Sequence, residues 1–357
     1  GDLKNSLHKV SLDLSTIPLI TKLMSICPLV DIEFENVLTS TRRFLLFSIN
    51  EEKFSIQSLK FLSALALQCF TNEYIYICDE KEVDAIKSLE ISIEKTFISG
   101  KQPSPEAILC LSTYKALYEY EWCHLITKTD HFEEVFRRQF LEPMEENYLS
   151  KDIRLLEKVT NKISNNVRKQ YEENPYPRWV NLSLSQKPAT ILKFINQLKL
   201  KIFNSEIYRV KIPQILIAGC GTGQQSIEKK SHFHNCKMLA IDLSLSSLAY
   251  AKRKTKELNI KNIDYVQSDI LDLYKLETQF HIVESVGVLH HMEDPMAGWR
   301  ILVDCLKPGG LIKIGLYSEM ARRSVVNIKK KINYLCLPQN DFSMKLFRQD
   351  LINSNEN

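Results

Sequence analysis

Residues Pro213–Gly223 read PQILIAGCGTG, and this stretch decides the fold of the 357-residue chain. An apolar run, Ile215–Ala218, leads directly into three glycines spaced two residues apart, and a helical pattern begins near Gln224. Glycine lets the backbone turn sharply and approach a ligand closely, and the helix that follows presents unpaired N–H groups. We therefore expect a strand, a ligand-binding loop and a helix. The glycine spacing alone is a weak signal, because dinucleotide enzymes and coincidental turns have similar strings.

A second apolar run, Met238–Asp242, ends in an acid 19 residues after Gly223. A carboxylate at the tip of the second strand of a parallel sheet can accept hydrogen bonds from both hydroxyls of a ribose. Ser244 follows, and Leu245–Leu258 has the pattern of a helix. Together with the glycine loop, this acid predicts a site for an adenine nucleoside.

The rest of this region alternates strand and helix patterns, which indicates a parallel sheet with crossover helices. The expected elements are a strand at Ile263–Asp269, a strand within Phe280–His291, a helix at Pro295–Leu306, a turn at Lys307–Gly310 and a strand at Leu311–Tyr317. Asp269 would lie at the carboxyl end of its strand, where it can meet adenine, although capping a helix or turn is the alternative role. Ligands of open α/β sheets bind beyond these strand ends.

Five motifs in this order and spacing resemble the motif series of class I S-adenosylmethionine-dependent methyltransferases: AGCGTG, AIDLS, QSDI, VGVLHHMEDP and LKPGGLIKIGLYS. The resemblance covers about residues 210–318. The segment KQYEENPYPRW (169–179) further resembles bacterial methyltransferases associated with tetratricopeptide repeats, in which a helical region precedes the catalytic domain. We find no such repeat in this chain.

The resemblance implies a Rossmann-like, doubly wound α/β domain with strand order 3-2-1-4-5, S-adenosylmethionine as cofactor and S-adenosylhomocysteine as product. It also assigns the cofactor contacts, which are Gly219, Cys220, Gly221 and Gly223 around the methionine part, Asp242 and Leu243 at the ribose, Ser268, Asp269 and Ile270 at adenine, and Ser285 and Val286 near the methyl-donor end.

The chain departs from the family pattern at two places. The first strand of the family commonly carries an acid two residues before the first glycine, and here that position is Ile217. A backbone carbonyl or another side chain would have to recognise the cofactor's amino group instead. After Met320 we see no sixth or seventh strand, so we expect a sheet that lacks the outer strands or a truncated chain.

Two residues are candidates for a catalytic base, His290 and Glu284. Methyl transfer from a sulfonium needs a base only when the acceptor holds a proton at the working pH. A histidine has a pKa suited to this role. The alternatives are that His290 and His291 pack the end of their strand as turn residues, and that Glu284 faces a polar partner.

The aromatic and basic residues Tyr171, Tyr176, Arg178 and Trp179 surround two prolines. Prolines force extended geometry on their neighbours and end a preceding helix. We expect either a lid that excludes water from the site, with Arg178 holding a carboxylate, or a rigid linker that docks the preceding helical domain.

The first part of the chain has helical periodicity and only two glycines before residue 165. We expect an all-α N-terminal domain (1–165), a Pro/aromatic linker or lid (166–187), the cofactor-binding domain (188–320) and a basic helical tail (321–357). Helical patterns lie at Thr39–Phe47, Ile56–Phe70, Pro105–Tyr120 and Phe132–Leu141, and we also expect a helix at Tyr74–Cys78.

Composition narrows the setting. The net charge is +4, with seven basic and three acidic residues in the tail, so a nucleic-acid partner is not expected. No apolar run is long enough to span a bilayer, so no membrane partner is expected either. The nine cysteines form no CxxC pair and indicate reduced thiols in the cytoplasm. The cluster His232–Cys236 lacks a second pair of ligands, so we expect a polar loop rather than a metal site.

These patterns predict an S-adenosylmethionine-dependent methyltransferase whose acceptor is not specified. A helical domain offers a large surface, so by analogy a protein or peptide acceptor is preferred over a small molecule, and the same domain could form a homodimer. The alternative is a cofactor-binding scaffold without catalysis. A nicotinamide oxidoreductase would share the glycine loop, but the LHHMEDP and KPGG segments argue against it.

Overall fold

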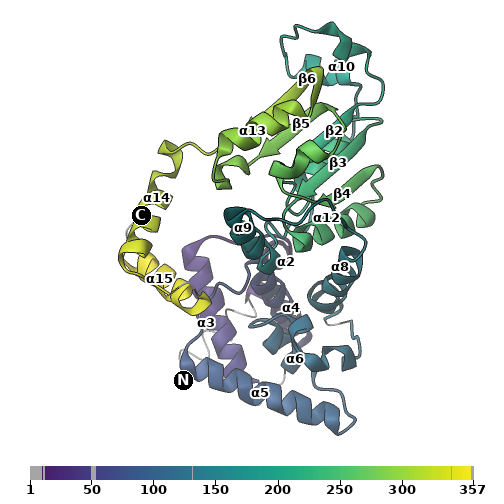
Figure 1. Ribbon diagram of the computed structural model, residues 1–357. Coiled ribbons are helices and arrows are strands. Elements are labelled where there is room, and N and C mark those ends of the chain that lie inside the picture. Colours follow the sequence, from purple (N-terminus) through teal and green to yellow (C-terminus); the bar gives the residue numbers. More distant parts are fainter. Residues whose placement is uncertain (1–9, 11–12, 50–53, 131, 339, 355–357) are drawn as a thin grey trace. The chain divides into compact units, whose positions relative to one another are not determined.

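The computed structural model describes residues 10, 13–49, 54–130, 132–338 and 340–354 (Figure 1). Contacts between Cα atoms divide the chain into two compact units. The first comprises Gly1–Met144 together with Lys330–Asn357, and the second is Glu145–Lys329. The C-terminal segment thus belongs to the same unit as the N-terminal helices.

The described part of the first unit is helical, as expected for the N-terminal region. Its α-helices are α2 (Pro18–Ile26), α3 (Ile32–Ser48), α4 (Ile56–Thr71), α5 (Glu80–Ile98), α6 (Pro105–Ser112), α7 (Glu133–Phe136) and α15 (Asp341–Asn353), with 3₁₀ turns η1 (Leu117–Glu119) and η2 (Glu121–Leu125) and a π-helical turn η3 (Arg137–Leu141). Helix α4 lies at the centre of the core and buries both Leu62 and Leu65. Arg348 of α15 donates a part-buried hydrogen bond to Glu35 of α3 over 2.8 Å.

The expectation of a helix at Tyr74–Cys78 is wrong. The chain leaves α4 through Glu73 and Tyr74, both with positive φ, and the Tyr74 amide donates to the Cys69 carbonyl over 2.7 Å. Asp79 then caps α5 by accepting from the Glu82 amide over 2.8 Å, in a capping box. Residues 75–78, between this turn and the helix cap, form an irregular connection instead.

The described residues of the second unit contain one six-stranded parallel sheet in the order β1-β4-β3-β2-β5-β6. The strands are β1 (Arg154–Leu155), β2 (Gln214–Ala218), β3 (Lys237–Asp242), β4 (Ile263–Gln267), β5 (Phe280–Val286) and β6 (Leu306–Gly315). Strands β2 to β6 confirm the expected order 3-2-1-4-5. The two-residue strand β1 was not predicted and extends the sheet beside β4.

Helices cover both faces of this sheet. They are α9 (Lys162–Glu173), α10 (Ile191–Gln197), α11 (Gln224–Ser231), α12 (Leu245–Glu257) and α13 (Pro295–Asp304), with 3₁₀ turns η4 (Ser205–Arg209), η5 (Ile270–Lys275), η6 (Leu289–His291) and η7 (Met320–Arg322). Successive residues of β2 point to opposite faces. Ile215 and Ile217 pack with α10 and α12. Leu216 and Ala218 pack with α13 in a separate cluster. This arrangement is the expected doubly wound fold, seen in Figure 1 in green.

The KPGG segment lies within β6 rather than before it. Phe280 of β5 lies opposite Leu306, but Ile282 lies opposite Leu311, so residues 307–310 bulge out of the register. Gly309 has a φ of +76° in this bulge, a conformation that glycine adopts readily. The sequence therefore located the irregularity correctly but not the start of the strand.

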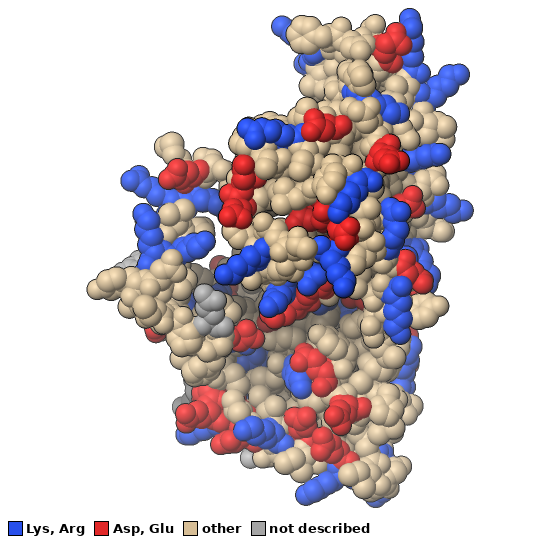
Figure 2. All heavy atoms as spheres, viewed as in Figure 1, with Lys and Arg blue, Asp and Glu red and all other residues tan. Residues whose placement is uncertain are grey.

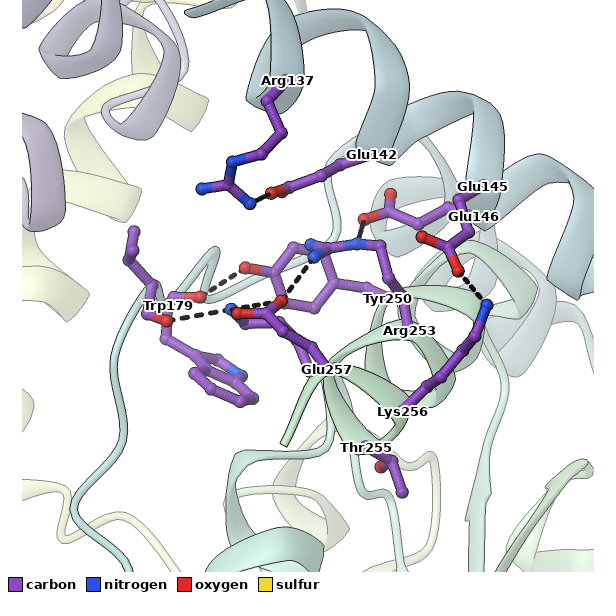
Figure 3. Close-up of polar contacts among 12 residues, drawn as sticks. Arg137, Glu142, Glu145, Glu146, Trp179, Tyr250, Arg253, Thr255, Lys256 and Glu257 are labelled. Carbon is purple, nitrogen blue, oxygen red and sulfur yellow. Dashed lines mark hydrogen bonds and ion pairs between the residues drawn. The ribbon is translucent and has the colours of Figure 1, made fainter. Parts of the chain in front are cut away.

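Two helices span the junctions between the units, α8 (Glu142–Ser150) and α14 (Arg323–Tyr334). Within the second unit, Arg253 and Lys256 of α12 pair with Glu146 and Glu145 of α8, at 2.8 and 2.6 Å (Figure 3). Arg253 is buried, so its ion pair fixes the end of α8 against α12 more firmly than the exposed Lys256 pair does.

After β6 the described residues form helices and no further strand, as expected. No helix among the described residues is both long and apolar enough to cross a bilayer. On the face shown in Figure 2, Lys and Arg are interspersed with Asp and Glu. The surface seen there has no broad patch of one charge.

Candidate active site

A cavity of about 420 Å³ lies at the carboxyl ends of the strands in the second unit. Its walls come from α9 and the residues after it, the glycine loop, the ends of β3, β4, β5 and β6, and η6. The lining residues are Ser164, Val167, Tyr171, Tyr176, Pro177, Gly219, Cys220, Gly221, Thr222, Gln224, Gln225, Asp242, Leu243, Ser268, Asp269, Ile270, Val286, Gly287, Val288, His291, Met292, Gly315, Leu316 and Tyr317. This is the place at which open α/β sheets bind ligands.

Glycine is required at the three positions of the loop for different structural reasons. A Cβ at Gly219 would lie 2.3 Å from Val288, and one at Gly223 would lie 2.5 Å from the Ala251 Cβ. At Gly221 the nearest atom would be the Tyr176 carbonyl oxygen, at 3.5 Å. Packing therefore excludes a side chain at Gly219 and Gly223, whereas Gly221 leaves open space on the side of the cavity.

Asp242 at the end of β3 closes the glycine loop onto the neighbouring strand. Its carboxylate accepts hydrogen bonds from the Gly221 amide over 2.8 Å and from the Ser244 amide over 2.9 Å. Burial raises the pKa of Asp242, and these two amides oppose the shift. The carboxylate is thus held in position at the cavity wall, where it can accept further hydrogen bonds.

The end of β4, the strand next to β3, also contributes to the cavity wall. Asp269 caps η5 by accepting from the Leu271 amide over 3.0 Å, so the capping role that we weighed as an alternative exists. Ser268, Asp269 and Ile270 also line the cavity. The cap therefore fixes this carboxylate beside the cavity and does not remove it from the site.

Helix α9 covers the cavity and is attached beside Asp242. Glu172, in its last turn, accepts from the amides of Leu245 and Ser246 over 2.8 and 2.9 Å. These amides form the N-terminus of α12, where a carboxylate is stabilised by unpaired N–H groups and the helix dipole. Ser244 also donates to the Tyr171 carbonyl over 2.9 Å.

The proline-containing segment is fixed to the glycine loop by Trp179. Its indole N–H donates to the Thr222 carbonyl over 3.1 Å, and the Thr222 hydroxyl donates to the Pro177 carbonyl over 2.8 Å. The Tyr250 hydroxyl donates to the Trp179 carbonyl (Figure 3). Tyr171 and Tyr176 line the cavity, whereas Arg178 and Trp179 are not among its described lining residues. Trp179 acts here as an anchor.

The other end of the cavity follows β5 and β6. Here His291 and Tyr317 line the wall, and the His291 ring lies 6.5 Å from the Tyr171 ring, edge to face. Burial together with the positive charges of Arg322 and Lys329 lowers the pKa of His291. A histidine with a lowered pKa is neutral at pH 7 and can accept a proton.

The two candidate bases that we predicted from the sequence lie outside the cavity lining. The His290 ring packs 4.0 Å from the Tyr317 ring, behind the wall, and its buried ring nitrogens have no hydrogen-bond partner among the described residues. Burial and the charges of His291 and Arg322 lower the pKa of His290. Glu284 is buried in β5 and pairs with Lys229 over 2.7 Å, the polar partner that we weighed as its alternative role.

Ser285 is buried in β5 and likewise is not among the described residues that line the cavity, although Val286 is. Ile217 is buried in the sheet and offers no polar group. Among the described residues, no three His, Cys, Asp or Glu side chains group closely enough to hold a metal ion.

Several lining residues were not predicted from the sequence. Val167 and Ser164 lie one and two turns before Tyr171 on α9, so a helix-face argument from Tyr171 would have found them. Gly287 directly follows Val286, and Val288 and Met292 each lie two residues from His290. Residues 315–317 were predicted as the end of a strand. No local pattern in the sequence shows that they line the same cavity as His291.

Comparison with known proteins adds to this geometry. Residues 215–310 match the profile of a family described as "Methyltransferase domain". Over 125 residues the chain is 35% identical to an uncharacterized protein of Synechococcus sp., covering 34% of this chain and 30% of that protein. Over 167 residues it is 29% identical to the ubiquinone biosynthesis O-methyltransferase of Coxiella burnetii, covering 43% and 66%. The chain therefore spans less than two thirds of the length of either relative.

Among solved structures, the chain is similar to PKMT2 from Rickettsia typhi in complex with AdoHcy, at 20% identity and a TM-score of 0.36, covering 46% of this chain and 32% of that one. The sequence match over residues 215–310 and the observed sheet order agree with each other. The C-terminal region of the chain therefore holds a class I, S-adenosylmethionine-dependent methyltransferase domain.

Proposed function

We propose that this protein transfers a methyl group from S-adenosylmethionine to an acceptor that enters at the His291 and Tyr317 end of the cavity. The observation that carries the proposal is the pairing of the Asp242 carboxylate with the Gly221 amide at the cavity wall. It joins the glycine loop and the acid at the end of β3 into one surface, which can hold the adenosine and the charged methionine part of the cofactor.

The residues present fit this cofactor. Gly221 leaves free the volume that a Cβ would fill, and Asp242 and Asp269 supply carboxylates to two separate parts of the cavity. Ile217 provides no acid for the cofactor's amino group. The Tyr176 carbonyl, 3.5 Å from the Cβ position of Gly221, supplies a polar acceptor next to the loop and is our candidate replacement.

When bound, S-adenosylmethionine supplies an electrophilic methyl group on sulfur, and the electron pair of the breaking C–S bond stays on that sulfur in S-adenosylhomocysteine. The residues of the chain supply orientation and exclude water. Helix α9, held by Glu172, covers the nucleoside end. His291, neutral at pH 7, accepts a proton through its ring nitrogen when the acceptor enters protonated. In our proposal His291 thus replaces His290 and Glu284 as the candidate base.

The identity of the acceptor stays a proposal. A protein or peptide acceptor, recognised by the helical unit, remains our preference, and that unit could also form a homodimer. The C. burnetii relative is named for ubiquinone biosynthesis, which favours a small molecule as the second candidate. We still predict that the 169–179 segment links this protein to the repeat-associated methyltransferases. We also predict a cytoplasmic location.

The competing function is that of a cofactor-binding protein without catalysis, which Ile217 motivates. Incubating the protein with methyl-labelled S-adenosylmethionine and fractionated lysate separates the two. We expect one fraction to gain label with the wild-type protein and not with Asp242→Asn. Binding of S-adenosylmethionine without transfer to any fraction would instead favour the non-catalytic function.

A further inference from the structure

Beyond β5 and β6, three rings in contact with one another lie beside a cation. The Arg322 guanidinium lies 3.6 Å from the centre of the Tyr317 ring. The Tyr317 ring lies 4.0 Å from the His290 ring, which lies 4.3 Å from the His291 ring. Tyr317 and His291 line the cavity directly. Arg322 is therefore in contact with a ring that lines the cavity, although it is not itself among the lining residues.

Positive charge accumulates at this end. Arg322 and Lys329 both lower the pKa of His291, and Arg322 also lowers that of His290. Arg322 is exposed and forms no ion pair with an acidic side chain in the part of the chain that the structure describes. No described carboxylate neutralises the arginine.

We propose that the acceptor carries an anionic group, a carboxylate or a phosphate, which Arg322 binds while the group to be methylated lies in the cavity beside His291 and Tyr317. The inference rests on the proposed function and specifies its substrate class. A guanidinium stacked on a ring keeps its N–H edges free, and a fixed planar fork matches a carboxylate or phosphate with two parallel hydrogen bonds. The stack on Tyr317 holds the fork at one place.

The charge of the methyl donor makes an anionic acceptor favourable here. The sulfonium is positive, and Arg322 and Lys329 add positive charge around His291, which lines the same cavity. An acceptor that is neutral or cationic would leave these positive charges to repel each other in a partly desolvated site. An anionic group offsets them, and the same positive potential favours the deprotonated form of the acceptor's nucleophile.

A different ligand group could satisfy the same arginine, namely the carboxylate of the cofactor itself. In that case substitution of Arg322 would weaken the binding of S-adenosylhomocysteine. In our proposal it does not, because the methionine part lies at the glycine loop, beside Gly221. Measurement of S-adenosylhomocysteine affinity therefore separates the two, and it also tests the proposed function independently.

The experiment uses the full chain saturated with S-adenosylhomocysteine. By calorimetry, we would titrate it with benzoate and phenyl phosphate as small anions, with a short glutamate peptide as a peptide anion, and with benzylamine as a cation of similar size. We expect saturable binding of at least one anion and none of benzylamine. Preference for the aromatic anions would indicate a small-molecule acceptor, and preference for the peptide a protein acceptor.

Arg322→Gln should weaken binding of that anion about tenfold or more, and Arg322→Lys should weaken it less, because the charge remains and the fork is lost. Arg323→Gln, at the exposed neighbouring arginine, is the matched control and should change nothing. Affinity for S-adenosylhomocysteine should stay within twofold in all three. The inference is overturned if no anion binds, if benzylamine binds equally well, or if Arg322→Gln weakens S-adenosylhomocysteine binding itself.

Discussion

The amide of Gly221 donates a hydrogen bond to the carboxylate of Asp242 over 2.8 Å, joining the loop after β2 to the end of β3. The two residues are 21 positions apart in the sequence, and Gly221 follows β2 whereas Asp242 ends the adjacent parallel strand β3. Because this bond forms between the glycine that leaves space and the acid that accepts hydrogen bonds, the two halves of the candidate cofactor site are positioned by each other.

Replacing Asp242 by asparagine should weaken S-adenosylhomocysteine binding by about 10- to 100-fold, the range expected when hydrogen bonds to a charged group are lost. Stability should fall by about 1–3 kcal/mol, because asparagine can accept from only one of the Gly221 and Ser244 amides. Calorimetry and thermal melting would measure the two quantities. Wild-type affinity in this variant would exclude Asp242 from the site.

The pH dependence of S-adenosylhomocysteine binding should reflect the titration of Asp242. Burial raises the pKa of Asp242 above its ordinary 3.8, and the ionised form is the one that accepts from the ligand. Affinity for S-adenosylhomocysteine should therefore fall as the pH is lowered through that raised pKa. The contribution of Asp242 to the free energy of unfolding has the opposite pH dependence. The folded state binds this proton more tightly than the unfolded state, so that contribution decreases as the pH rises from about 3.8 through the raised pKa. A binding profile that is unchanged in Asp242→Asn would contradict this assignment.

Alanine substitutions should separate folding from binding in the glycine loop. Gly219→Ala places a Cβ 2.3 Å from Val288 at a φ of +77° and should destabilise the fold by about 2–5 kcal/mol. Gly221→Ala meets nothing closer than 3.5 Å, so only the cost of its positive φ applies, about 1–2 kcal/mol. Its methyl group should nevertheless reduce cofactor affinity at least tenfold. Chemical denaturation and calorimetry on both variants test this contrast, and intact binding by folded Gly221→Ala would contradict it.

Glu172→Ala should loosen helix α9 over the cavity. The variant loses acceptors for the amides of Leu245 and Ser246 and a negative charge at the N-terminus of α12, at a cost of about 1–3 kcal/mol. We expect faster dissociation of S-adenosylhomocysteine in stopped-flow experiments. Glu173→Ala, at the exposed neighbouring position, is the matched control. Equal dissociation rates in both variants would show that α9 does not close the site.

The sequence predicted that Gly221, Asp242 and Asp269 lie together at one edge of the sheet, because chain direction and strand ends decide it. Gly221, Asp242 and Asp269 each follow a recognisable strand, and parallel strands bring their carboxyl ends to one edge. The apolar pattern of each strand was sufficient to locate its end, and thus the residues that meet there. Neither the packing of Val288 nor that of Ala251 had to be known.

The acceptor half could not be predicted in the same way. His290 and His291 are adjacent in one 3₁₀ turn, and which of them lines the cavity depends on Tyr317, which follows another strand. Similarly, Trp179 is an anchor because the Thr222 carbonyl lies within reach of its indole N–H. Strand β1 has two residues and no periodicity, so only its pairing with β4 defines it.

The central claim is that the cavity beside Gly221 and Asp242 binds S-adenosylmethionine, and calorimetric titration of the folded protein tests it most directly. Our account predicts saturable heat at one site with both S-adenosylmethionine and S-adenosylhomocysteine, and none with a nicotinamide dinucleotide. Heat with the nicotinamide dinucleotide alone, or no heat with either adenosyl compound, would contradict it.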